Sequence, residues 1–127
     1  MAVQNQGIDW SVIAAEDLDN TTAGTGHIYK AIAFNDRKLA ANGSEASGII
    51  QQVGKSGEHV GVTVSGISKY TAGGAVTAGA LLTGAASGYL TAATSGDVVC
   101  GRNGTDAVTS GSVGTGIFQF AGAEAVI

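Results

Sequence analysis

The sequence predicts an all-β fold, a small β-barrel or sandwich of short strands with an extended N-terminal arm. Short apolar stretches separated by turn signals are typical of all-β barrels and sandwiches. No long segment shows an apolar stripe with the 3.6-residue period of a helix. The chain has 127 residues, enough for one domain, and 21 of them are glycine while none is proline.

The large side chains are few, which predicts a thin core. The chain has one Trp, three Phe, three Tyr and one Met. Most other apolar residues are Ala and Val, and apolar burial contributes only about 25 cal/mol per Å². We therefore expect partner surfaces to complete the fold, because small scaffolds without disulfides or metals often gain stability by oligomerising.

The charge balance disfavours nucleic acid and anionic membrane surfaces as partners. The formal net charge is −4 and the pI is about 4.8, so the chain repels phosphate groups. The first residues lack the basic and apolar regions of a signal peptide, and no run approaches the length of a membrane span. A single cysteine excludes a disulfide framework. These features predict a soluble product made in the cytoplasm.

Residues 1–26 differ from the rest and are expected to form the arm, leaving residues 27–127 as a β-rich domain. The stretch is polar, and Ser11 is expected to cap a short helical turn over residues 14–16. Disordered tails are usually poor in aromatics, so a tryptophan here argues for an anchored arm. The expected anchor is one apolar island: Trp10, Val12, Ile13 and Leu18.

From residue 27 onward the signals are those of strands. Val60, Val62 and Val64 alternate with small or polar residues, a period of two, and the apolar phase shifts at Gly66, which indicates a β-bulge. Residues 71–96 are rich in Ala, Gly, Thr and Ser, and we expect ordered tight turns there. Further strands are expected at residues 27–34, 49–53, 97–100 and 113–120, with a turn at Asn42-Gly43 and a packed apolar tail at Val126-Ile127.

The sequence contains no motif of a catalytic, cofactor-binding or metal site, so none is expected. The stretch G-I-I-Q-Q-V-G-K-S at residues 48–56 has five residues between its glycines where a P-loop needs four, so we expect a strand followed by a turn. His27 and His59 have no ligand spacing with Cys100 and are expected as solvated residues at strand starts. Cys100 follows two valines and is expected in the core. The chain is therefore not expected to be an enzyme.

The sequence of residues 48–121 resembles, in its short motifs, the capsid decoration, or cement, proteins of tailed bacteriophages. The resemblance rests on five motifs: G-E-H-V-G-V at 57–62, V-S-G-I at 64–67, T-A-G-G-A-V-T-A-G at 71–79, S-G-Y-L-T at 87–91 and V-G-T-G-I at 113–117. The resemblance implies a compact β fold that forms trimers, binds the major capsid protein on the outer surface of the virion and stabilises the head. Residues 1–47 contain no motif of that family.

The arm is the expected shell-binding element. A strand that it adds to an exposed shell edge would gain affinity from backbone hydrogen bonds, with Trp10 as the aromatic anchor. The alternative is a host-binding module of a phage fibre or an adhesin, whose polar loops would contact sugars. The number of aromatic residues is low for a surface on which sugars stack.

Overall fold

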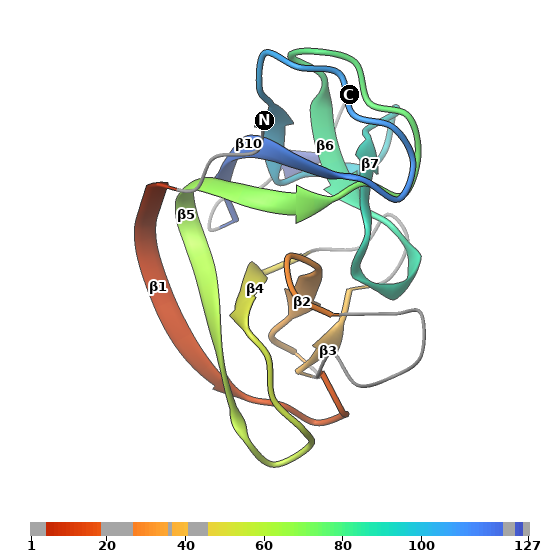
Figure 1. The fold of residues 1–127 in the computed structure, drawn as a ribbon. Helices are drawn as coiled ribbons and strands as arrows, with labels where there is room; N and C mark the ends of the chain where they lie inside the picture. The colour runs from red at the N-terminus through yellow and green to blue at the C-terminus, as the bar shows by residue number, and fades with distance from the viewer. Residues whose placement is uncertain (1–4, 19–26, 36, 41–45, 121–123, 126–127) are drawn as a thin grey trace.

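The chain folds into a curled antiparallel sheet that forms a half-barrel (Figure 1). The computed structural model describes residues 5–18, 27–35, 37–40, 46–120 and 124–125, with the backbone alone for residues 5–9 and 124–125. These residues contain one 3-10 turn and no α-helix, which confirms the all-β prediction. The elements are β1 (Asn5–Ile13), β2 (Ala31–Ala33), β3 (Lys38–Leu39), β4 (Gly48–Gln52), β5 (His59–Thr71), β6 (Leu81–Gly84), η1 (Ala86–Gly88), β7 (Leu90–Ala92), β8 (Val98–Val99), β9 (Gly101–Asn103), β10 (Val113–Gln119) and β11 (Glu124–Ala125).

The longest strand, β5, joins two halves of the sheet. Its first half pairs with β4, which leads through β2 to β3, and its second half pairs with β10, which leads through β9 and β6 to β7. Strand β1 pairs with β5 from Asn5 opposite Ile67 to Ile13 opposite His59. Strand β1 pairs with residues of β5 that also pair with β4 or with β10. It must therefore lie along the opposite edge of β5 from those two strands. We call the β2–β3–β4 side the lower half and the β6–β7–β9–β10 side the upper half.

The bend between the halves lies at the position where the sequence predicts a bulge. The register between β1 and β5 shifts twice, next to Ser65 and Gly66, which confirms the bulge. Gly66 has φ of 111°, in a region that side chains rarely adopt, so glycine fits the bend. Figure 1 shows β5 changing direction within its length. One strand can therefore belong to two differently oriented halves.

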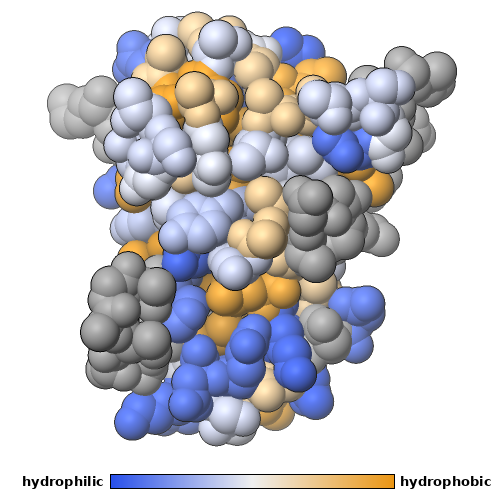
Figure 2. All heavy atoms as spheres, turned by 90° about the vertical axis from the view of Figure 1, so that its right-hand side faces the viewer, coloured by the Kyte–Doolittle hydropathy of each residue, from blue (hydrophilic) through white to orange (hydrophobic). Residues whose placement is uncertain are grey.

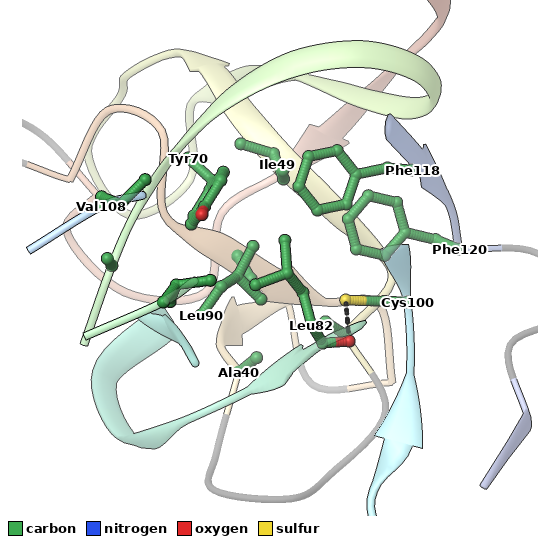
Figure 3. Packing of buried hydrophobic residues seen from close by; sticks show 13 residues of the cluster. Ala40, Ile49, Tyr70, Leu82, Leu90, Cys100, Val108, Phe118 and Phe120 are labelled. Atoms are coloured by element: carbon green, nitrogen blue, oxygen red, sulfur yellow. Dashed lines mark hydrogen bonds between the residues drawn. The ribbon is translucent and has the colours of Figure 1, made fainter. Parts of the chain in front are cut away.

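The sheet carries two apolar clusters, of which the larger lies mainly in the upper half but also includes Ala31 of β2 and Ile49 of β4. The larger, upper cluster includes an aromatic group in which Phe118 stacks on Phe120 at 5.4 Å and meets Tyr70 edge-on at 5.8 Å between ring centroids (Figure 3). The smaller, lower cluster consists of the buried residues Val12, Ala14, Leu18, Ile32, Ile50, Val60 and Val62. Alternation along β2 and β4 contributes to this division, because Ala31 and Ile49 join the upper cluster whereas their neighbours Ile32 and Ile50 join the lower one.

Several local predictions are corrected. The helical turn after Ser11 is wrong, because Ser11 lies inside β1 and that strand continues to Ile13. The strand expected over residues 27–34 shrinks to β2, since Tyr29 has φ of 63° and lies inside a turn that the Lys30 amide closes by donating to the His27 carbonyl. The expected turn at residues 42–43 and the apolar tail at 126–127 lie outside the described residues.

Other local predictions are confirmed. Residues 48–52 form β4 rather than a phosphate-binding loop, and the low-complexity stretch 71–96 contains β6, η1 and β7. The strand expected over 97–100 is found as the shorter β8, and a further strand, β9, follows Cys100. The strand expected over 113–120 is β10.

Candidate functional site

The strand β1 combines an open edge with an exposed tryptophan. Within the described residues β1 pairs with β5 alone, so its other edge has no strand beside it. The side chain of Trp10 is 62% exposed and that of Ile13 is 42% exposed. An edge strand of this kind offers backbone hydrogen-bonding groups to an extended partner segment. The open edge of β1, with Trp10 and Ile13, is the first candidate binding surface.

The backbone geometry identifies which residues of β1 face the open edge. The amide of Ala14 donates to the Glu58 carbonyl at 2.9 Å, so Ala14 directs its backbone groups toward the β5 side. Alternation then directs the backbone groups of Val12 toward β5 and those of Ser11 and Ile13 away from it. The hydroxyl of Ser11 also lies 3.1 Å from Nδ1 of His59.

The four predicted anchor residues separate into two pairs. Trp10 and Ile13 are exposed, whereas Val12 is 8% exposed and Leu18 is fully buried. Val12 and Leu18 belong to the lower cluster and offer no surface to a partner. Their apolar character therefore stabilises this chain's own fold. A binding role for Trp10 and Ile13 stays a prediction.

The segment after β1 is fixed to the lower half by hydrogen bonds. Leu18 and Gly54 exchange backbone bonds of 2.8 and 3.0 Å. The carboxylate of Glu16 accepts a bond from the Leu39 amide at 2.8 Å, and that of Asp17 accepts one from the Ser56 amide at 2.9 Å. Residues 5–18 are thus part of the folded domain. The expected boundary at residue 26 falls among residues 19–26, outside the described part, and stays a prediction.

A second candidate surface lies on the outward face of the upper half, and the sequence analysis did not find it. Ile117 is 61% exposed, Val113 43% and Leu81 37%. The strict alternation of β10, in which Val113, Thr115, Ile117 and Gln119 face outward, was a usable signal for the β10 part of this surface. The register with neighbouring strands, which no local pattern reveals, brings Leu81 into the same row.

Polarity also differs over the surface. Figure 2 shows one face of the molecule, on which the strongly hydrophilic side chains gather mainly in the lower part. The upper part of that face is mostly weakly polar, with hydrophobic patches between. A surface poor in charge is easier to desolvate than a charged one, which favours contact with another protein.

Cys100, His59 and His27 do not form a metal-binding group in the described part of the chain. Cys100 is 2% exposed, its thiol contacts the Leu82 carbonyl at 3.5 Å (Figure 3), and burial raises its pKa to about 12. This confirms Cys100 as a core residue. His59 is exposed at the start of β5, as expected, but His27 is buried, so its expected solvation is wrong. No group of three metal-ligating side chains occurs among the described residues.

No membrane-crossing helix is present in the part of the chain that the structure describes. A search of protein-family models finds no match, and no curated protein matches the sequence.

A solved structure, by contrast, is similar in fold over nearly the full chain. It is the N base of the head fibre gp8.5 of bacteriophage phi29, with a TM-score of 0.67 and 14% sequence identity. The alignment covers 89% of this chain and 94% of that one. At this level of identity the similarity establishes a shared fold.

Proposed function

We propose that this chain is a non-enzymatic structural protein of a phage virion, which attaches to the outer surface of the head as an oligomer and stabilises the shell as a decoration protein.

 The observation that supports this proposal is the similarity of fold to the phi29 head-fibre base over nearly the whole of both chains. The major capsid protein is the proposed partner, and a trimer is the proposed assembly.

The open edge of β1 is the proposed shell contact. An extended segment of the capsid protein laid beside β1 would exchange backbone hydrogen bonds with Ser11 and Ile13, whose backbone groups face away from β5. Trp10, exposed on the same strand, supplies a large aromatic surface for the partner to cover. The proposed arm therefore acts as a fixed edge of the domain.

Oligomerisation would strengthen this contact. Several copies of the edge, linked in one assembly, bind several shell subunits at once, and linkage raises the effective concentration of each further contact. Individually weak contacts can then resist the outward force of packaged DNA on neighbouring subunits.

The test is co-sedimentation of the purified protein with undecorated phage heads. Ser11→Pro removes the outward amide, and proline is tolerated on edge strands where the N–H faces away from the sheet. We expect this variant to bind heads about tenfold more weakly, a change of about 1.4 kcal/mol. Ser11→Ala keeps the amide and loses only the hydroxyl near His59, so it is the matched control and should bind as wild type.

Two outcomes contradict the proposal. Wild-type protein that does not sediment with heads excludes the shell as its partner, and binding on a glycan array would then favour the host-binding alternative. Head binding unchanged in a folded Ser11→Pro protein excludes the β1 edge as the contact.

A further inference from the structure

The outward face of the upper half has a row of three aliphatic residues and one arginine that runs across four strands. Ile117 on β10 lies opposite Ile67 on β5 and opposite Arg102 on β9, and Arg102 in turn lies opposite Leu81 on β6. Residues directly opposite in an antiparallel sheet project to the same side, so these side chains share one face. Ile117, with 61% of its surface exposed, is the most exposed aliphatic residue of the row.

Two shallow hollows lie along this row, one on each side of Ile117, and Ile117 lines both. The first, of about 670 Å³, includes Leu81, Val99 and Arg102 in its lining. The second, of about 520 Å³, includes Ile67, Val113 and Asp106. Ile117 is thus a ridge with a hollow on each flank.

The two flanks carry opposite charges. Arg102 is exposed, and its guanidinium is held in place by a 2.8 Å bond from Nη1 to the Gly79 carbonyl. Asp106 is exposed on the other flank. A ridge with one cationic and one anionic flank is complementary to another copy of itself, because the first flank of one copy can face the second flank of the next.

We infer that this face is the contact surface between copies of the chain, with the Ile117 ridges packed together and Arg102 of one copy directed toward Asp106 of its neighbour. Around a twofold axis this contact would be isologous, with both charge pairs formed, whereas around a threefold axis, as the proposed trimer requires, it would be heterologous and would close into a ring. The inference deepens the proposed function, which takes the protein to be an oligomer, and it assigns self-association to a surface distinct from the β1 edge.

The experiment measures the mass and dissociation constant of the purified full chain by analytical ultracentrifugation, without heads. We expect the wild type to associate and Ile117→Asp to weaken association about tenfold or more, the effect of losing a central interface residue. Ile117→Thr, a smaller change that keeps β-branching, guards against misfolding. Ile13→Thr makes the same change at an exposed isoleucine of β1 and should associate as wild type.

Charge exchange tests the orientation. Arg102→Glu and Asp106→Arg should each weaken association, because each places like charges on facing flanks. The double variant restores opposite charges and should recover most of the wild-type association. Recovery requires that the two side chains meet across the contact, so a general loss of stability cannot produce it.

Three results overturn the inference: a wild-type protein that stays monomeric, association insensitive to Ile117, or a double charge variant no better than the single ones. Failure here is distinguishable from failure of the proposed function. A monomer that still sediments with heads contradicts the self-contact and the proposed trimer but leaves the shell partner in place, whereas an oligomer that does not sediment with heads contradicts only the shell partner.

Discussion

Replacing Gly101 by alanine tests the close approach of β9 and β10 in the upper core. A Cβ at Gly101 would lie 2.5 Å from Cδ1 of Phe118 and 2.6 Å from the Ile117 carbonyl oxygen, where ordinary contact begins at 3.4 Å. Phe118 has little room to move, because its ring is stacked on Phe120 and meets Tyr70 edge-on. The paired strand itself supplies the second obstacle.

The expected cost follows from these contacts. Overpacking a well-packed core costs about 1–3 kcal/mol, and a clash with both a confined ring and a backbone oxygen places Gly101→Ala near the upper end, about 3 kcal/mol. For a domain of this size that corresponds to a fall in Tm of roughly 10 °C.

Urea denaturation at a fixed protein concentration measures this cost, since association makes stability concentration-dependent. Gly61→Ala is the matched control, because its Cβ would meet only Gln52, at an ordinary 3.5 Å. The control should be neutral or stabilised by up to about 1 kcal/mol, as alanine restricts the unfolded chain. Equal stability of Gly101→Ala and the wild type would refute the packing argument.

Three further perturbations have defined outcomes. Leu18→Ala should lower the free energy of unfolding, measured by urea denaturation, by about 2–5 kcal/mol, because Leu18 is fully buried. Ile13→Ala, at an exposed site, should change it by less than about 0.5 kcal/mol. Equal effects of the two variants would contradict the placement of residues 5–18 in the domain. Tyr70→Phe removes the 2.8 Å bond from the Tyr70 hydroxyl to Oδ1 of Asn103 and should lower the free energy of unfolding by about 1–2 kcal/mol, so an unchanged urea midpoint would count against that bond. Burial raises the pKa of Cys100 from 9.0 to about 12, so the folded state favours the thiol over the thiolate. The contribution of Cys100 to stability should be full below pH 9 and fall by about 1.4 kcal/mol per pH unit as pH rises toward 12, and a Cys100→Ala protein with the same alkaline slope as the wild type would contradict this.

The sequence by itself determined the fold class and most strand positions. Alternation at Val60, Val62 and Val64 reflects a two-residue period that any half-buried strand must have, and it predicts β5 correctly. The phase shift at Gly66 indicates the bulge for the same reason. The apolar setting of Cys100 predicts its burial. These are local signals, and local geometry is enough to interpret them.

The tertiary structure alone decided which apolar residues stay outside. Trp10, Val12, Ile13 and Leu18 look alike as one apolar island, yet only Val12 and Leu18 are buried, because β1 pairs along β5 and the following segment is bonded to Gly54. Likewise, Leu81 and Ile117 come together only through the register of β6, β9 and β10. Exposure depends on which strands become neighbours, and residues far apart in the chain determine that pairing by packing against one another.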